Sequence, residues 1–272
     1  MVPIAHTQDT AGPMARSVLD VAVGHAVLVD APVANVREDV AAGSLSGMRI
    51  GVVRSATGYH EGVDAVFERA LGDLRAAGAL LVDDLELVRP EGFGRDSYAV
   101  LLHEFRDDLD AWLANQDVPP PVDSLEAVIA FNEANAERTM PFFRQEILEA
   151  ARDVEGTASE SYATALEHIR RVTREEGLER LFAEHTLDAV VAPTEGPAWV
   201  IDRVNGDHFL GGFSTFPAVG GYPHLTLPMG RLHGLPLGLS IVGRREADVF
   251  VLGLGHAYES TRTLHEVGAP LD

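Results

Sequence analysis

The side chains that usually carry catalysis are unevenly represented in this sequence of 272 residues. It has 11 histidines and 42 acidic residues, and each of its 21 basic residues is an arginine. Cysteine is absent, which excludes disulfides, thiolate nucleophiles and cysteine-based zinc sites. A P-loop is excluded as well, because its motif requires a lysine.

The motifs of familiar hydrolases are also missing. His103 and Glu104 begin an H-E-x-x-H pattern, but Asp107 stands where the second histidine ligand belongs. Residues 43–47 have Leu45 where a G-x-S-x-G elbow places its nucleophilic serine. We expect the scattered histidines and carboxylates to be surface groups, with no dedicated metal site and no cofactor.

The charge balance argues against a nucleic-acid partner. The formal net charge is −21 at pH 7, whereas phosphate binding depends on clustered lysine and arginine. The sequence has no apolar run of about 18 residues for spanning a bilayer and no basic-then-apolar leader. We therefore expect a globular protein of the cytoplasm, with no nucleic-acid or membrane partner.

Five short apolar runs predict strands. They lie at residues 49–53, 79–82, 187–192, 225–227 and 237–242. We expect a turn around His233 and Gly234 to join the last two. Pro223 and Pro228 should lie at strand ends, because proline lacks the N–H group that a strand ladder uses.

Apolar residues at helical spacing predict the elements between the strands. A first helix is expected to begin at Pro13, since proline at the first helical position loses no hydrogen bond. A stripe over residues 63–74 completes a strand–helix–strand unit, but no G-x-G-x-x-G follows its first strand, which argues against dinucleotide binding. Residues 247–261 should form the last helix.

The middle of the sequence, residues 93–185, is mostly helical in pattern. Three prolines within residues 117–121 predict an extended linker. Thr157 and Glu160 form a capping-box pattern at the start of a further helix. Together the elements predict an α/β protein, a mixed β-sheet covered by helices, organised as a single domain over residues 1–272. Residue patterns alone predict no function beyond that fold.

Several segments, taken together, resemble the amidase signature hydrolases. Residues 3–18 and the Gly/Pro-rich stretches at 220–230 and 234–244 look like the part of such an enzyme that follows its nucleophilic serine. The peptide-amidase-like branch is similar in four further segments, which are residues 129–132, 140–146, 192–199 and 204–209. They follow in the family's order, and the resemblance extends from Pro3 to about Thr261.

The resemblance implies an amidase-signature-like α/β fold and an amide hydrolase that acts on C–N bonds. In that family a serine attacks the amide carbonyl, and a second serine beside a cis peptide bond relays the proton to a buried, neutral lysine. Backbone N–H groups of a glycine-rich loop stabilise the oxyanion. Arginine cannot replace the lysine, because guanidinium does not deprotonate in proteins. No catalytic residue carries over, so we expect a C-terminal portion, truncated at the N-terminus and inactive alone.

The resemblance does imply a set of residues around the substrate cleft or in its supporting shell. They are Gln8, Asp9, Thr10, Phe131, Asn132, Phe143 and Trp199. Arg144 departs from the related branch, where a small residue is expected.

The expected substrate is a small amide or a peptide amide, bound once the missing N-terminal half completes the site. Apolar faces left uncovered, around Met14, Val18 and Val21 and around residues 225–227, predict a homo-oligomer or a complementary fragment as partner. Two alternatives stay open. One is a non-catalytic remnant that binds amides or a protein partner, and the other is an unrelated acidic hydrolase that uses histidines and carboxylates.

Overall fold

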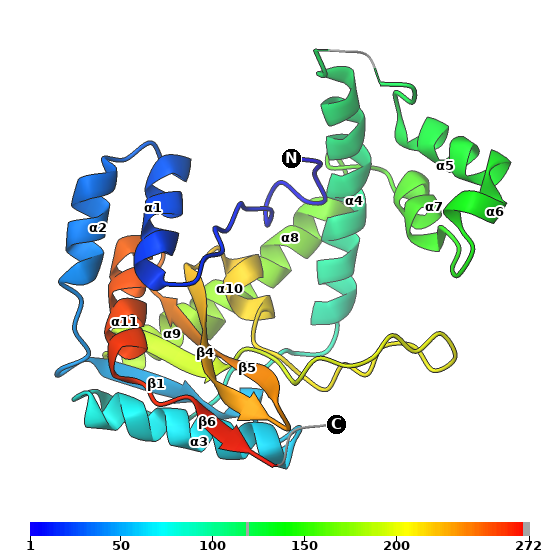
Figure 1. Ribbon diagram of the computed structural model, residues 1–272. Coiled ribbons are helices and arrows are strands. Elements are labelled where there is room, and N and C mark those ends of the chain that lie inside the picture. Colours follow the sequence, from blue (N-terminus) through cyan, green and yellow to red (C-terminus); the bar gives the residue numbers. More distant parts are fainter. Residues whose placement is uncertain (118–119, 269–272) are drawn as a thin grey trace. The chain divides into compact units, whose positions relative to one another are not determined.

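The computed structural model describes residues 1–117 and 120–268, and these fall into two compact units. The first unit comprises Met1–Thr10 and Arg89–Val172, and the second comprises Ala11–Val88 and Thr173–Asp272 (Figure 1). The first is helical, whereas the second holds the β-sheet. Among the described residues, no helix combines the length and the apolar character needed to cross a membrane.

A six-stranded mixed sheet organises the second unit, in the order β2-β1-β3-β5-β4-β6. Its strands are β1 (Arg49–Val53), β2 (Leu80–Leu85), β3 (Ala189–Pro193), β4 (His224–Leu232), β5 (Leu235–Gly243) and β6 (His265–Val267). Strand β1 pairs in parallel with β2 and β3, while β5 pairs antiparallel with β3 and β4, and β4 pairs in parallel with β6. The predicted mixed sheet is confirmed, and β6 is an addition to it.

Helices cover one face of this sheet. They are α1 (Val18–Leu28), α2 (Val33–Ala41), α3 (Glu61–Ala76) and α11 (Asp248–Thr261), and their apolar residues form one core with the strands. Shorter elements complete the unit, namely η1 (Arg54–Ala56), η2 (Arg174–Leu178), α9 (Glu179–Glu184) and α10 (Thr215–Gly220). Alternate residues of β5 lie on opposite faces of the sheet. Leu237, Leu239 and Ile241 belong to that core, whereas positions 238 and 240 lie on the other face.

The turn between β4 and β5 forms where the sequence predicts it. His233 (φ 51°) and Gly234 (φ 83°) both adopt the left-handed conformation, which matches the twist of a tight hairpin. Pro223 precedes β4 as expected. The prediction for Pro228 was wrong, because it lies within β4, beside a shift in strand register between Pro228 and Gly230 that accommodates its missing N–H.

The first helix begins five residues later than predicted. Ser17 caps α1, because its hydroxyl accepts a hydrogen bond from the backbone N–H of Asp20. A side-chain cap here replaces the predicted proline start at Pro13. The apolar face predicted to be uncovered is only partly so, since Met14 is 96% exposed but Val18 and Leu227 are buried.

The first unit is built around the long helix α4 (Phe93–Ala114). Its other helices are α5 (Leu125–Ala134), α6 (Ala136–Thr139), α7 (Glu146–Asp153) and α8 (Glu160–Thr173). Leu102, Leu109 and Leu113 of α4 pack against Leu125 and Ile129 of α5. Part of the predicted proline linker, residues 118 and 119, lies outside the described residues.

The capping box predicted for α8 was wrong in its residues. The hydroxyl of Ser159 accepts from the backbone N–H of Tyr162 at the helix start. Thr157 instead donates both its backbone N–H and its hydroxyl to the carboxylate of Asp107 on α4. The tertiary hydrogen bonds to Asp107 thus replace the local capping role that the sequence pattern assigned to Thr157.

Candidate functional site

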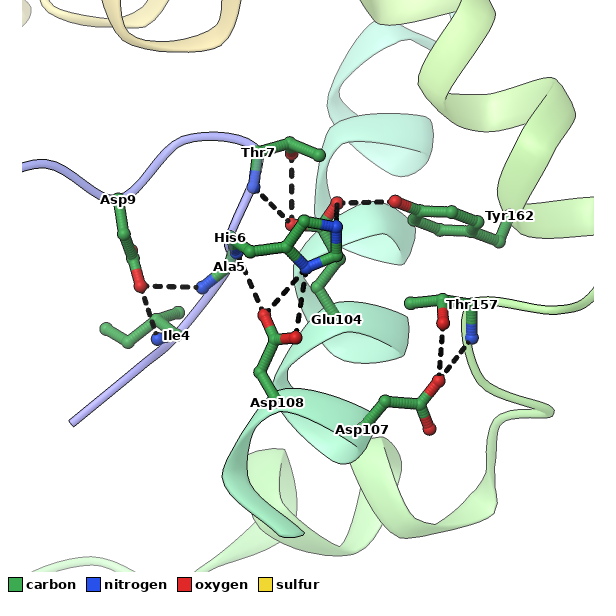
Figure 2. A network of polar contacts seen from close by, with 10 residues as sticks. All are labelled: Ile4, Ala5, His6, Thr7, Asp9, Glu104, Asp107, Asp108, Thr157 and Tyr162. Carbon is green, nitrogen blue, oxygen red and sulfur yellow. Dashed lines mark hydrogen bonds and ion pairs between the residues drawn. The ribbon is translucent and has the colours of Figure 1, made fainter. Parts of the chain in front are cut away.

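The N-terminal segment is held against α4 by a network of polar contacts (Figure 2). The carboxylate of Asp108 accepts hydrogen bonds from the backbone N–H of His6 (2.9 Å) and lies 2.8 Å from its imidazole Nδ1. One turn earlier, the carboxylate of Glu104 accepts from the backbone N–H and the hydroxyl of Thr7, at 3.2 and 3.0 Å. We call these four residues, together with Tyr162, the N-terminal clamp.

Glu104 is the buried centre of the clamp. Its side chain has no exposed surface, and its Oε1 accepts a 2.6 Å hydrogen bond from the hydroxyl of Tyr162 on α8. Burial, reinforced by this hydrogen bond and by the nearby negative charge, raises the pKa of Tyr162 well above its usual value. Tyr162 is therefore a neutral donor, which is what a buried carboxylate requires.

His6, Glu104 and Asp108 also have the residue types of a metal site, with one ligand atom from each lying within 4.8 Å of the others. However, both oxygens of Glu104 already accept hydrogen bonds from Tyr162 and Thr7. The carboxylate of Asp108 is likewise engaged by His6. We therefore interpret the cluster as a structural clamp for the N-terminal segment.

Three of the residues implied by the resemblance, Gln8, Asp9 and Thr10, follow the clamp directly. The carboxylate of Asp9 accepts from the backbone N–H groups of Ile4 (2.7 Å) and Ala5 (3.1 Å), which closes the turn on itself (Figure 2). The side-chain nitrogen of Gln8 is buried and has no hydrogen-bond partner among the described residues, whereas Thr10 is exposed. In this unit Asp9 thus supports the backbone of its own turn.

Phe131, Asn132 and Phe143 lie elsewhere in the same unit. Asn132 on α5 donates from its amide nitrogen to Oε1 of Gln145 (3.1 Å), which ties α5 to the segment before α7. Phe131 is 51% exposed and Phe143 is 76% exposed, so both present bare aromatic rings.

Helix α4 separates these two groups of residues. Each helical residue turns by about 100°, so Glu104 lies on the opposite side of the helix from Leu113, and Asp108 lies about 140° away from Leu113. The N-terminal segment binds the first side, and α5 packs on the second. The structure therefore does not bring residues 8–10 together with Phe131, Asn132 and Phe143.

Trp199 belongs to the second unit, in a long loop of residues 194–213 that is drawn in yellow in Figure 1. A bridge between Glu195 and Gly212 closes the base of this loop. At its tip, the carboxylate of Asp202 accepts from the backbone N–H of Asn205 (2.9 Å) and from its side-chain amide (2.8 Å), and these hydrogen bonds lower the pKa of Asp202. Trp199 is 37% exposed.

A second polar arrangement, which the sequence reading missed, crosses the sheet of the second unit. His224 Nε2 lies 2.6 Å from Ser240 Oγ, and Ser240 Oγ donates to Thr194 Oγ1 at 3.0 Å. Thr194 Oγ1 in turn lies 2.5 Å from Thr226 Oγ1. We call these four residues the hydroxyl chain.

The sheet itself positions the hydroxyl chain. Thr226 of β4 and Ser240 of β5 are direct cross-strand partners, and Thr194, which follows β3, donates its backbone N–H to the carbonyl of Gly238 (2.7 Å). Side chains two residues apart on a strand share a face, so His224 joins Thr226 on this face, away from the apolar core. The chain runs from buried Ser240 to exposed Thr226.

Burial fixes the charge state of His224. Removal from solvent lowers its pKa to about 4, so the imidazole is neutral at pH 7. The ring of Phe213 meets that of His224 edge-on, with centroids 6.5 Å apart. The only signal in the sequence was polar residues alternating with apolar ones along two short strands, among glycine and proline turns.

Comparison with known proteins identifies a family and several proteins that this chain resembles. A family model described as Amidase matches residues 1–252. A protein named probable amidase from Arabidopsis thaliana is 29% identical over 98% of this chain and 51% of its own length. Mandelamide hydrolase from Pseudomonas putida is 28% identical over 96% of this chain and 51% of its own length.

The solved structure of native peptide amidase from Stenotrophomonas maltophilia superposes with a TM-score of 0.85 at 33% identity. That match covers 97% of this chain and 56% of the peptide amidase. The chain thus spans about half the length of the curated relatives it matches. Because the family model covers most of the sequence, the chain belongs to the amidase family.

Proposed function

We propose that this chain supplies the part of an amide hydrolase that surrounds the substrate, and that it does not cleave amides on its own. The proposal rests on one observation that combines the fold of the chain with its composition. The chain superposes over 97% of its length on a peptide amidase, yet it contains no lysine. The catalytic serine–serine–lysine set implied by the resemblance therefore cannot be assembled from this chain.

The reaction class we propose is hydrolysis of a C–N bond in a neutral amide. Support comes from the relatives of this chain, which include a mandelamide hydrolase and a peptide amidase. Peptide amides are the substrate class we favour within this range. The likeness to peptide amidase reaches a TM-score of 0.85, compared with 0.60 for an aryl acylamidase.

We propose the seven residues implied by the resemblance as supporting shell or cleft. The hydrogen bonds of Asp9 within its own turn support a shaping role for Gln8, Asp9 and Thr10. The exposed rings of Phe131, Phe143 and Trp199 would suit contact with an apolar substrate group. A single working domain, a complementary fragment or second copy as partner, and a cytoplasmic location stay predictions.

A non-catalytic binding module is the second candidate, and the absence of lysine favours it. Ammonia release from N-acetyl-L-phenylalaninamide distinguishes the two. In both cases the chain alone should release no ammonia above background. Activity should appear on addition of the peptide amidase segment outside the match only if this chain is part of a hydrolase.

A further inference from the structure

The hydroxyl chain begins at a buried residue of the sheet and ends in an exposed hydroxyl. Ser240 is fully buried and Thr194 is half-buried, whereas Thr226 is exposed. A buried polar network is costly unless every member is satisfied. Here each member has a partner, so the network is complete up to Thr226.

The proton of each group can be followed along the chain. Ser240 gives its only proton to Thr194, so the short contact with His224 requires the imidazole to donate from Nε2. Thr194 accepts from Ser240, and either hydroxyl could donate in the contact between Thr194 and Thr226. Because Thr226 is the acceptor that the hydroxyl chain offers to the proton of Thr194, we assign Thr194 as the donor. With this assignment the O–H of Thr226 is directed away from the other members of the hydroxyl chain and can donate to a ligand.

Gly238 is built into this geometry. A Cβ atom at residue 238 would lie 2.8 Å from the hydroxyl oxygens of both Thr194 and Thr226. Those oxygens belong to β-branched side chains with few rotamers, so they cannot move aside easily. The absent side chain therefore lets the two hydroxyls meet.

The charge of the hydroxyl chain itself favours one kind of ligand. Every member of the hydroxyl chain is neutral at pH 7, because burial keeps His224 uncharged. A neutral donor without a positive charge in the hydroxyl chain suits the oxygen of a carboxamide, whereas a carboxylate gains more from a charged donor.

We infer that the Thr226 hydroxyl, oriented through Thr194 and Ser240 by His224, donates a hydrogen bond to the carbonyl oxygen of a neutral carboxamide and discriminates against the corresponding acid. The inference rests on the proposed function and names a specificity-determining residue for it. Thr226 is the group that touches the ligand, while Ser240 and His224 are positioning residues.

The test is ligand binding followed by NMR of threonine methyl groups in the whole chain. N-acetyl-L-phenylalaninamide should shift the methyl signals of Thr194 and Thr226, while N-acetyl-L-phenylalanine should bind at least about fivefold more weakly. Thr226→Val should weaken carboxamide binding by about fivefold, as read from the Thr194 methyl, and Thr226→Ser should restore it. Ser240→Ala should give a smaller loss.

Thr263→Val is the matched control, because Thr263 is an exposed threonine outside the hydroxyl chain. It should leave binding unchanged, and thermal unfolding of each variant verifies the fold. Equal binding of amide and acid overturns the inference, as does unchanged affinity in Thr226→Val or the absence of shifts at both methyls. This test measures binding and needs no turnover. Failure of the inference can therefore be distinguished from failure of the proposed function, which the complementation assay tests.

Discussion

The imidazole of His224 contacts Ser240 diagonally across two strands, with Nε2 and Oγ 2.6 Å apart. His224 is the cross-strand partner of Val242, and Ser240 is the partner of Thr226, so the hydrogen bond steps over one pair in the ladder. Diagonal neighbours lie within reach of long and aromatic side chains. The contact places a neutral imidazole at the buried end of a chain of hydroxyls.

Stability should fall as pH decreases because of His224. Its pKa in the folded state is about 4, against an ordinary value near 6.5. Between these values the unfolded chain binds more protons than the native one, so the stabilisation present above pH 6.5 is lost as pH falls toward 4. Between pH 7 and pH 5 the free energy of unfolding should drop by about 2 kcal/mol through this residue.

Urea unfolding of wild type and His224→Gln at pH 7 and pH 5 measures this contribution. Glutamine keeps an N–H donor for Ser240 but does not titrate. The variant should therefore lose about 2 kcal/mol less than wild type over the same pH interval. Identical pH dependence of the two proteins would show that His224 remains accessible to protons in the fold.

A methyl group at residue 238 should disrupt the hydroxyl chain. Gly238→Ala places a Cβ against Thr194 and Thr226 and should cost about 1–3 kcal/mol of unfolding free energy. Gly72→Ala is the matched control, because a Cβ at residue 72 of α3 meets nothing within 4 Å. That control should instead stabilise the chain by about 0.5–1 kcal/mol. A similar effect of the two substitutions would refute close packing around Gly238.

The N-terminal clamp should loosen when Glu104 loses its charge. Glu104→Gln keeps the shape of the side chain but turns an amide nitrogen toward one of the donors on Tyr162 or Thr7. Destabilisation by about 1–3 kcal/mol is expected, with faster hydrogen exchange at the backbone amides of residues 7–9. Glu133→Gln, an exposed position on α5, should change neither property. Unaltered exchange at residues 7–9 in Glu104→Gln would mean that the clamp does not hold this segment.

Much of the sheet could be predicted from the sequence because its strands are short apolar runs bounded by glycine and proline. The β4–β5 hairpin and helix α11 follow from such local signals. The start of α1 and the cap of α8 could not be predicted in this way. Ser17 and Ser159 form these caps, and Thr157 instead hydrogen-bonds to Asp107, which is distant in the sequence. Competition between local and tertiary hydrogen bonds is invisible in one sequence.

The site was harder to predict than the fold. The seven residues implied by the resemblance could be named from motifs, but motif order does not reveal that α4 separates residues 8–10 from Phe131. The hydroxyl chain depends on strand register, which aligns Thr226 with Ser240 only once β4 and β5 have paired.

The most direct test of the account is ammonia release from N-acetyl-L-phenylalaninamide, measured for the chain alone and for the chain mixed with the peptide amidase segment that lies outside the match. The account predicts background release by the chain alone, because it has no lysine, and release above background when the segment is present. Thr226→Val should reduce the activity of the mixture, whereas Thr263→Val should leave it unchanged. Turnover by the chain alone that is abolished by Ser240→Ala would contradict the account, because catalysis would then reside in the residues of this chain.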